Sequence, residues 1–423
     1  MFKDIETLCV QGGYEPKSGE ARVLPIYQST TYKYDDPKHL SDLFDLKAEG
    51  HIYSRISNPT LDGFEKKMAS LENGVGAVST SSGMSAILYS ILNLCKAGDN
   101  FISLASIYGG SHTLFTTTLK DFGIEVRFLD IDYTNEDFKS LIDENTKCVF
   151  GESLTNPNLE ILDIKKLSTL TKKFNLPLII DNSLATPYLL RPIDYGANIV
   201  VHSATKYIDG HASSVGGIII DGGNFDYTDS KFVDFNKEDS SYHGVIYTRD
   251  FKNLCYIIKL RVQLLRNIGS TLAPFNAYLF NLGLETLHLR MERHSQNAFR
   301  LAQYLETHEK VAWVNYPKLE SNKYYDLSNT YLKKGGSGIL SFGLKGGYEA
   351  SLTLSKNLKL ANLVVHLADV RTSYLHPAST THRQLSDDEL NRAGIKKELI
   401  RISVGIESFE DIKKDFELAL SKI

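Results

Sequence analysis

The stretch LPLIIDNSLATPYLLRPIDYGANIVVHSATK, residues 176–206, contains two apolar runs that each stop at polar residues. The first run ends at Asp181, and the second, Ile199–Val201, comes shortly before Lys206. Continuous apolar runs of this length are typical of strands buried on both faces, which occur in parallel sheets connected by helices. The stretch therefore predicts one strand–helix–strand step of an α/β fold, with an acid and a lysine at the same edge of the sheet.

The same alternation of apolar runs and helical segments fills the chain from residue 61 onward. It predicts a mostly parallel central sheet with helices on both faces. Residues 221–248, rich in charge, Gly and Tyr, are typical of a long inserted loop. The predicted strands lie at residues 74–80, 100–106, 125–131, 147–153, 176–182, 198–204 and 216–221.

The two ends of the chain differ from this central part. Residues 1–60 are rich in Gly, Pro, Tyr and Thr without a sustained helical period, which indicates an extended arm. Residues 285–308 have clear helical spacing, and apolar runs at 338–344 and 399–406 predict strands of a smaller α+β domain. The predicted parts are an arm (1–60), a large domain (61–275) and a small C-terminal domain (276–423).

The composition limits the classes of partner. The 423 residues hold 47 Lys and Arg against 51 Asp and Glu, a formal net charge of -4, so neither nucleic acid nor a membrane surface is an expected partner. Cys9, Cys95, Cys148 and Cys255 are scattered without metal-ligand spacing, which favours structural thiols in a reducing compartment and no metal site. The N-terminal residues lack the apolar core of a signal peptide, and no apolar run approaches the roughly 18 residues that span a bilayer. We therefore expect a cytoplasmic protein that acts on a small molecule.

Three groups at predicted strand ends could carry chemistry together. Ser81–Ala86, a small-residue turn before a helix, could bind a phosphate through backbone N–H groups, although such turns are usually only helix caps. Asp181 could form a turn and Lys206 could reach solvent, as such residues usually do. Taken as a set, a desolvated lysine, a carboxylate and a phosphate-binding turn are what pyridoxal 5′-phosphate (PLP) requires. Ser203 and Thr205, close to the lysine, would add hydroxyl donors to the phosphate.

Motifs along the whole chain resemble one family of PLP enzymes. They are YSRISNPT (53–60), SSGMSA (81–86), IYGGSH (107–112), ESLTNPNL (152–159), IIDNS (179–183), HSATKYIDGH (202–211), HPASTTH (376–382) and IRISVGIE (400–407). Their content and order resemble the Cys/Met-metabolism PLP enzymes of fold type I, from about residue 5 to the C-terminus. The resemblance implies PLP as the cofactor and an α/β transferase fold, with a mostly parallel central sheet and a smaller C-terminal α+β domain.

The resemblance also implies roles for individual residues. Lys206 matches the catalytic Schiff-base lysine, Asp181 the partner of the pyridine nitrogen, and Tyr108 the ring that stacks on the cofactor. Arg401 matches the arginine that clamps the substrate's α-carboxylate, a task suited to its planar fork. The other implied cofactor contacts are Ser82, Gly83, Met84, Ser203 and Thr205 around the phosphate, and Asn156 near the 3′-oxygen.

The resemblance further implies an oligomer. Tyr53 and Arg55 match an arm segment that reaches the phosphate of a neighbouring subunit, with Tyr53 also at the substrate. The implied assembly is a homotetramer built from dimers.

The branch of the family decides the reaction. The insertion at 221–248 and the stretch 261–298 look most like the O-acetylhomoserine sulfhydrylases, which convert O-acetyl-L-homoserine and sulfide to L-homocysteine and acetate in methionine biosynthesis. Methionine γ-lyases usually carry cysteine where Gly110 stands, which weakens the interpretation as a methionine γ-lyase. A methionine γ-lyase and a cystathionine γ-synthase or γ-lyase are the alternatives. A catalytically silent relative that serves as a binding protein is a more distant alternative. The sequence allows free sulfide, a small thiol or a carrier-protein thiocarboxylate as the sulfur donor.

One stretch departs from the family pattern. Residues 366–373 precede the motif at 376–382, and sulfhydrylases more often show Asn and Gly there, other branches Ser and Gly. We interpret His366 in this stretch as a structural histidine with satisfied hydrogen bonds.

Overall fold

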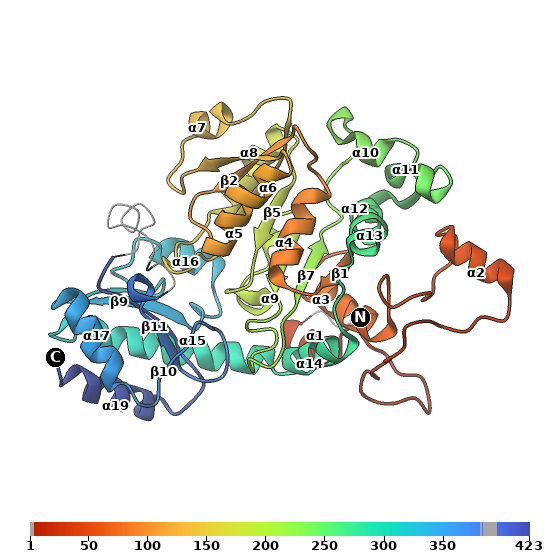
Figure 1. The fold of residues 1–423 in the computed structure, drawn as a ribbon. Helices are drawn as coiled ribbons and strands as arrows, with labels where there is room; N and C mark the ends of the chain where they lie inside the picture. The colour runs from red at the N-terminus through yellow and green to blue at the C-terminus, as the bar shows by residue number, and fades with distance from the viewer. Residues whose placement is uncertain (1–3, 381–382, 384–395) are drawn as a thin grey trace.

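The computed structural model describes residues 4–380, 383 and 396–423 of the chain. Two β-sheets organise it, a large one in the first half of the chain and a small one near the C-terminus. In Figure 1 the small sheet and its helices lie at lower left, and helix α15 (Leu287–Glu306) runs from them along the bottom toward α14 (Pro274–Glu285). Thr381 and His382 of the motif HPASTTH lie outside the described residues.

The large sheet has seven strands in the spatial order β1-β7-β6-β5-β4-β2-β3. The pairs among β2 to β6 are parallel, whereas β7 pairs antiparallel with both β1 and β6. The prediction of seven strands in a mostly parallel sheet is therefore confirmed. The strands are β1 (Gly76–Thr80), β2 (Asn100–Leu104), β3 (Glu125–Leu129), β4 (Thr146–Glu152), β5 (Leu178–Asp181), β6 (Ile199–Ser203) and β7 (Gly217–Asp221).

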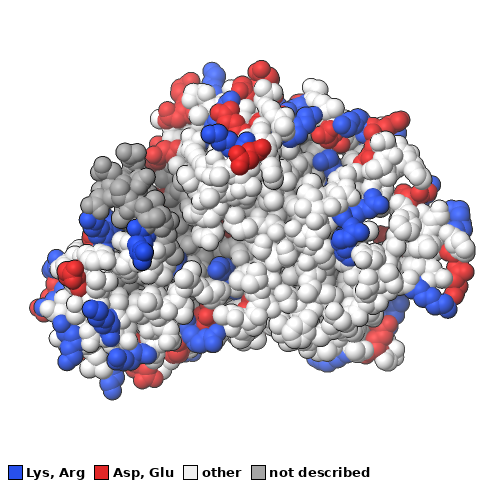
Figure 2. All heavy atoms as spheres, in the orientation of Figure 1, with Lys and Arg blue, Asp and Glu red and all other residues white. Residues whose placement is uncertain are grey.

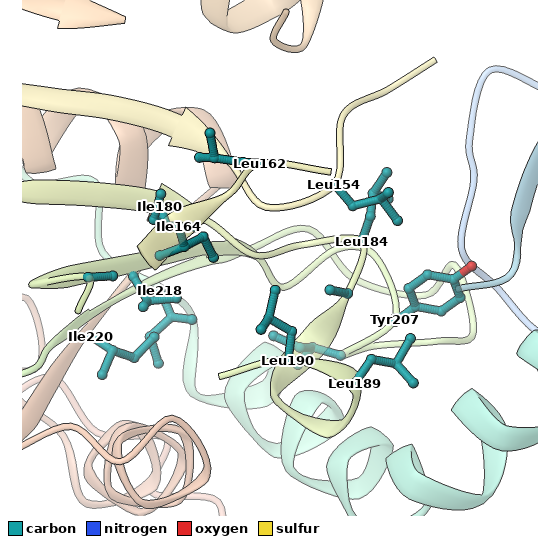
Figure 3. Close-up of a cluster of buried hydrophobic side chains, with 14 of the residues drawn as sticks. Leu154, Leu162, Ile164, Ile180, Leu184, Leu189, Leu190, Tyr207, Ile218 and Ile220 are labelled. Atoms are coloured by element: carbon teal, nitrogen blue, oxygen red, sulfur yellow. The ribbon is translucent and has the colours of Figure 1, made fainter. Parts of the chain in front are cut away.

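The strands of this sheet send alternate side chains into two separate hydrophobic cores. On β5, Leu178 and Ile180 belong to one core and Ile179 belongs to the other. Figure 3 shows part of the first core, in which Ile180 lies near Ile218 and Ile220 of β7. Because successive side chains of a strand point to opposite faces, both faces of the sheet are covered, as the continuous apolar runs predict.

The helices of the first part of the chain surround this sheet. Asn58 caps α3 by accepting a hydrogen bond from the Thr60 N–H, and Pro59 occupies the first turn, so that local sequence fixes where this helix begins. The α-helices are α3 (Pro59–Leu71), α4 (Gly83–Leu92), α5 (Gly109–Thr113), α6 (Leu119–Asp121), α7 (Asn135–Ser140), α8 (Ile164–Lys173), α9 (Thr186–Leu189), α12 (Cys255–Lys259) and α13 (Arg266–Ile268). Short non-α turns are η1 (Leu114–Thr118), η2 (Pro192–Tyr195), η5 (Lys252–Leu254) and η6 (Leu260–Leu265).

The small sheet has five strands in the order β10-β11-β12-β9-β8. The runs predicted at 338–344 and 399–406 form β9 and β12, which pair antiparallel and share a core with α15, α17 and α19. The predicted domain limit at 275/276 falls inside α14, and the three-part division of the chain stays a prediction. The elements are β8 (Val311–Asn315), β9 (Ile339–Leu344), β10 (Asn362–Leu363), β11 (Ser373–Leu375), β12 (Leu399–Ser403), α16 (Tyr325–Tyr331), α17 (Gly347–Asn357), η7 (Pro377–Ser379) and α19 (Phe409–Leu420).

The N-terminal arm is less extended than the sequence predicts. It contains two short helices, α1 (Ile5–Gln11) and α2 (Pro37–Phe44). α1 buries Ile5 and Cys9 and packs against α3, α14 and α15, whereas α2 and the segments around it project from the body at the right of Figure 1. Two turns are too few for a helical period to show in the sequence, so packing against the rest of the protein stabilises these helices.

Residues 221–248 are also more ordered than the predicted loop. They contain η3 (Ser230–Phe232), α10 (Val233–Asn236) and η4 (Ser240–Tyr242), and they lead into α11 (Tyr247–Phe251). Tyr227 holds them together by stacking on Phe235 and Tyr256, with ring centroids 4.7 and 5.7 Å apart. Aromatic packing of this kind leaves no periodic signal in the sequence.

The remaining sequence expectations concern cysteines and surface. The four cysteines are free and buried, as expected for structural thiols. Within the described part of the chain, no helix has both the length and the apolarity that a bilayer crossing requires. Acidic and basic side chains are intermixed on the face that Figure 2 shows, without a large patch of either sign.

Candidate active site

Lys206 lies just beyond β6, at the carboxyl end of the large sheet. The next residue, Tyr207, is fully buried and fixes the backbone at this point. Its hydroxyl accepts a hydrogen bond from the Gly338 N–H at 3.1 Å, and its ring packs edge-on against His294. In Figure 3 Tyr207 lies at one end of the buried cluster, with its oxygen directed away from the cluster. The chain therefore anchors one neighbour of Lys206 in the core.

The Lys206 side chain has no acidic partner and makes no hydrogen bond to a described residue. Burial, together with the charge of Arg401, lowers the pKa of Lys206 from its ordinary 10.5 to about 8. Lys206 is half-buried, which favours a desolvated amine over a lysine that merely reaches solvent. An amine with a pKa near 8 can act as a nucleophile or a base at neutral pH.

Asp181 ends β5, the strand beside β6, and pairs with Val201 in the register. Its carboxylate accepts a hydrogen bond from the Ser183 N–H at 2.9 Å. Burial raises the pKa of Asp181, while the hydrogen bonds from Ser183 and the charge of His202 oppose the rise. A ligand that brings a positively charged N–H group to this carboxylate would favour its ionised form. The structure thus brings the predicted acid and lysine to the same end of the sheet.

The start of α4 approaches the end of β6 closely because the contact residue is glycine. A Cβ on Gly83 would lie 2.6 Å from the Cβ of Ser203, and a Cβ on Gly217 would lie 2.2 Å from the Ser82 carbonyl oxygen. The first turn of α4 therefore presents the N–H groups of Gly83 and Met84 beside Ser203. A helix N-terminus of this kind is suited to bind a phosphate.

The three hydroxyls predicted near the phosphate are not equivalent. Ser82 caps α4, since its oxygen accepts a hydrogen bond from the Ser85 N–H at 3.1 Å. The Thr205 hydroxyl donates to the Gly216 carbonyl oxygen at 3.2 Å and accepts the Gly216 N–H at 3.1 Å. The Ser203 hydroxyl makes no hydrogen bond within the described residues. Ser203 is therefore the hydroxyl that is most available to a ligand.

Tyr108 directly precedes α5, and half of its surface is exposed. Its backbone N–H donates to Glu152 Oε1 at 2.6 Å. A Cβ on Gly110 would lie 2.4 Å from Cε1 of the Tyr108 ring, so glycine at this position lets the ring lie across the start of α5. The exposed aromatic face is suited to stack on a planar ligand.

Arg401 enters the site from the small sheet, on β12. It is only 7% exposed, and no carboxylate of a described residue lies within ion-pair distance of it. Nη1 donates to Asn156 Oδ1 at 3.2 Å, Nη2 makes a long contact of 3.5 Å with the Val365 carbonyl oxygen, and Nε is buried without a partner. Burial lowers the pKa of Arg401 to about 10, and its charge interacts with Tyr108 and Lys206. A buried guanidinium whose Nε has no partner and whose Nη2 has only a long contact is suited to bind a carboxylate along its Nε–Nη2 edge.

Tyr53 and Arg55 are not brought to these residues within the chain. The Arg55 guanidinium donates to the Arg266 carbonyl oxygen and lies over the Tyr53 ring, 5.2 Å from its centroid. The Thr271 hydroxyl donates to the Arg55 carbonyl oxygen at 2.8 Å. The arm thus places both side chains against the segment around α13.

His366 lies near the site, and its interpretation as a satisfied structural histidine is wrong. Its Nε2 atom is buried without a partner, and the side chain makes no hydrogen bond to a described residue. Burial and the charge of Lys206 lower its pKa. His366 is therefore a neutral imidazole at the edge of the site at neutral pH.

Sequence reasoning missed Glu152, which ends β4 beside Asp181 and holds the Tyr108 backbone. It stands at the end of the predicted strand 147–153, so the rule that ligands bind at the carboxyl ends of strands could have found it. It also missed Ser183 and His202, whose effect on Asp181 depends on packing between strands.

The surface is hollowed between the two sheet-containing parts. Figure 2, in the orientation of Figure 1, shows this hollow between the lower-left part and the large-sheet part above it. A separate cavity of about 990 Å³ lies at α15 and α16, lined among others by Arg293, Lys318 and Lys333. None of the strand-end residues described above lines that cavity.

The model of the Cys/Met metabolism PLP-dependent enzyme family matches residues 6–421. The chain belongs to this family. Its relatives in the Cys/Met metabolism family include a homocysteine synthase of Schizosaccharomyces pombe, 46% identical over 98% of both chains, and an O-acetyl-L-homoserine sulfhydrylase 1 of Thermus thermophilus, 43% identical over 99% of this chain and 100% of the other.

Solved structures of the Cys/Met metabolism family share the fold. An O-acetylhomoserine (thiol)-lyase from Campylobacter jejuni, described as putative and carrying a pyridoxyl-lysine monophosphate at its position 205, superposes with a TM-score of 0.95 at 40% identity, over 99% of this chain and 100% of that one. The metB protein of Corynebacterium glutamicum superposes with a TM-score of 0.83 at 32% identity, over 99% and 98%. The expectation of a fold type I PLP-dependent enzyme is confirmed.

The strand ends of this Cys/Met metabolism enzyme fit PLP. The close approach at Gly83 leaves helix N–H groups for a phosphate, Asp181 can accept from a pyridinium N–H, and Lys206 has an amine that is reactive near neutral pH. These three groups come from the start of α4, the end of β5 and the segment after β6, so the fold rather than any single motif assembles the site.

Proposed function

We propose that the chain is an O-acetylhomoserine sulfhydrylase, which replaces the acetate of O-acetyl-L-homoserine by sulfide and releases L-homocysteine and acetate in methionine biosynthesis. The observation that carries the proposal is Arg401, a buried guanidinium that has no carboxylate partner among the described residues and interacts with Lys206. A substrate with an α-carboxylate next to its reacting amine and Cα–H fits this arrangement.

The proposal assigns a task to each group of the site. Bound PLP supplies an electron sink that stabilises negative charge on the substrate. Lys206 would hold the cofactor covalently, and its free amine would be placed to take the proton from the substrate Cα, which its pKa of about 8 allows. Asp181 holds the pyridine nitrogen, and Tyr108 covers the cofactor ring.

The remaining contacts orient cofactor and substrate. The N-terminus of α4, at Ser82, Gly83 and Met84, binds the phosphate together with Ser203 and Thr205. Asn156 holds Arg401 by accepting from Nη1 and lies near the cofactor's 3′-oxygen. Arg401 binds the substrate carboxylate through its Nε–Nη2 edge, which directs the Cα–H toward Lys206.

The choice of sulfide over the alternatives rests on similarity and on one glycine. The relatives at 40–46% identity include a homocysteine synthase and O-acetyl-L-homoserine sulfhydrylases, whereas the metB structure is 32% identical. Gly110 replaces the cysteine usual in methionine γ-lyases, and a side chain there would collide with the Tyr108 ring.

The purified PLP-loaded enzyme is incubated with O-acetyl-L-homoserine under three conditions: with sulfide, with cysteine, or without a sulfur compound. We expect homocysteine and acetate with sulfide as the main products. Cystathionine as the main product, formed with cysteine, would instead indicate a cystathionine γ-synthase. Predominant 2-oxobutanoate and ammonia without a sulfur compound would indicate a γ-lyase.

The same proposal includes a homotetramer built from dimers, in which Tyr53 and Arg55 reach the phosphate site of a neighbouring copy and Tyr53 also reaches the substrate. The arm supports this because Val23, Ile26 and Tyr27 expose 53%, 40% and 45% of their surface on the single chain. Sedimentation of the holoenzyme tests it, and a fully active monomer would refute it. A cytoplasmic location, supported by four free and buried cysteines, completes the proposal.

A further inference from the structure

Glu152 and Asp181 place two carboxyl groups side by side at the ends of β4 and β5. They are paired residues in the register of these parallel strands, and neighbouring strands run roughly 5 Å apart. Glu152 is only 6% exposed. Within the described residues, no lysine or arginine pairs with either carboxyl group. Burying a carboxyl group costs free energy, so we expect Glu152 to have a task at this position.

The hydrogen bonds of Glu152 connect it to two loops of the site. Its Oε1 accepts the Tyr108 N–H at 2.6 Å, the bond that fixes the backbone where the exposed ring begins. The backbone N–H of Asn156 faces the same carboxyl group and favours its ionised form. Asn156 in turn accepts from Arg401. One side chain therefore links the ring-bearing loop with the loop that supports the guanidinium.

The neighbouring acid decides the charge of Glu152. Asp181 has the hydrogen bonds of Ser183 and the charge of His202 to support its anion, and a bound pyridinium would add a further partner. Two adjacent buried anions repel each other, so the acid without a cationic neighbour takes up a proton first. Burial and the charge of Asp181 raise the pKa of Glu152 well above its ordinary value.

We propose that Glu152 is a positioning residue that holds the Tyr108 and Asn156 loops at the cofactor, and that it does so as an uncharged acid beside an ionised Asp181. As an uncharged acid it keeps a carbonyl oxygen for the backbone N–H groups without adding a second negative charge under the pyridine ring. Its length matters, because a shorter side chain on β4 does not reach the Tyr108 N–H. Its charge does not matter, because the bond that defines its role is accepted from the Tyr108 backbone N–H and needs only an accepting oxygen.

Length and charge can be separated with three substitutions. Glu152→Gln keeps the length and an accepting carbonyl oxygen but cannot ionise. Glu152→Asp keeps the carboxyl group but is one methylene shorter, and Glu152→Ala removes the contact. Glu160→Asp is the matched control, because Glu160 lies in the loop that follows β4 and its carboxylate accepts no hydrogen bond from a described residue.

The measurements follow the cofactor rather than turnover, so they remain valid for any substrate of the enzyme. Calorimetry on each apoenzyme gives the affinity for PLP and for 4′-deoxypyridoxine 5′-phosphate, which lacks the aldehyde and so reports non-covalent binding alone. Visible circular dichroism of the PLP-loaded oligomer reports how the protein orients the ring. Thermal unfolding of the apoenzymes identifies any variant that fails to fold.

We expect Glu152→Gln and the control to bind both ligands within about threefold of the unmodified chain and to keep its circular dichroism. Glu152→Asp and Glu152→Ala should bind on the order of tenfold more weakly, as for one lost hydrogen bond to the binding loop, with altered circular dichroism. The reverse order, with Asp tolerated and Gln harmful, would show that the charge is needed and would overturn the proposal. Unchanged binding in all three variants would show that Glu152 holds nothing and would overturn it as well. The Asp and Gln variants decide the matter even if the Ala variant does not fold.

Discussion

Replacing Arg401 by lysine tests the part of the proposed site that defines the substrate. The guanidinium uses Nη1 for Asn156, while Nε is buried without a partner and Nη2 has only a 3.5 Å contact. The free Nε–Nη2 edge can therefore donate two parallel hydrogen bonds to a carboxylate. A lysine keeps the positive charge but has a single nitrogen, so it cannot bind Asn156 and also present such an edge.

The magnitude follows from the bonds that are lost. A hydrogen bond between charged groups contributes about 1.5–3 kcal/mol, and the substitution removes one such bond and misaligns the Cα–H relative to Lys206. We expect a loss on the order of 2–4 kcal/mol in transition-state stabilisation, or roughly 30- to 1000-fold in kcat/KM for O-acetyl-L-homoserine. PLP content should stay normal, because in the proposal Arg401 does not touch the cofactor.

The assay measures kcat/KM and PLP stoichiometry on the same Arg401→Lys preparation. Arg300→Lys is the control, since Arg300 lies on α15 and pairs with Glu410 at 3.0 Å on the surface. The control should leave both quantities unchanged. If kcat/KM of Arg401→Lys fell only in proportion to lost PLP, Arg401 would be a structural residue, and the carboxylate would have to bind elsewhere.

Three further predictions concern the cofactor. The rate at which the apoenzyme captures PLP covalently should rise with pH, with a midpoint near 8, because burial and Arg401 hold the Lys206 pKa at about 8 and only the neutral amine attacks. Lys206→Ala should capture no PLP. A midpoint near 10.5 would contradict the proposed site. Arg55→Ala should lose PLP faster on dialysis, since it removes a charge-assisted contact to a neighbour's phosphate, and equal retention by an intact oligomer would refute that contact. Gly110→Cys should displace the Tyr108 ring, because its Cβ would lie 2.4 Å from Cε1, and unchanged visible circular dichroism of bound PLP would show that the ring does not contact the cofactor.

The large sheet could be predicted because its signal is local. Each strand is a continuous apolar run, and burial on both faces is what such a run requires, as Ile179 and Ile180 show by entering opposite cores. The direction of β7 could not be predicted in this way, since an antiparallel strand buried on both faces has the same apolar run. The short helices α1 and α10 were missed because packing against distant segments stabilises them.

The site residues likewise divide into those with a local signal in the sequence and those that depend on packing between distant segments. Lys206 and Asp181 stand directly after apolar runs, so strand ends alone made them candidates. Arg401 could not be recognised from its surroundings in the sequence, because what makes it a receptor is that no carboxylate of a described residue lies within ion-pair distance of it. From the sequence we interpret His366 as a structural histidine with satisfied hydrogen bonds, but its Nε2 has no partner. A lone histidine beside an apolar run gives no sign of whether its nitrogens will find partners.

The charges of the site explain why it suits one anionic and one cationic ligand group. Lys206 and Arg401 lie at one side and have no acid of the described residues bonded to them. Burial lowers the pKa of both, and the charge of Arg401 lowers that of Lys206 further. Asp181 and Glu152 lie at the ends of the two neighbouring strands, where only one of them can be ionised at low cost. A substrate carboxylate on Arg401 therefore offsets a buried positive charge, and a pyridinium on Asp181 offsets the negative one. Because each ligand group neutralises a charge that the fold has already buried, binding relieves an unfavourable arrangement in the protein. The burial and the Arg401 charge that lower the Lys206 pKa also prepare this amine to exchange protons with the substrate.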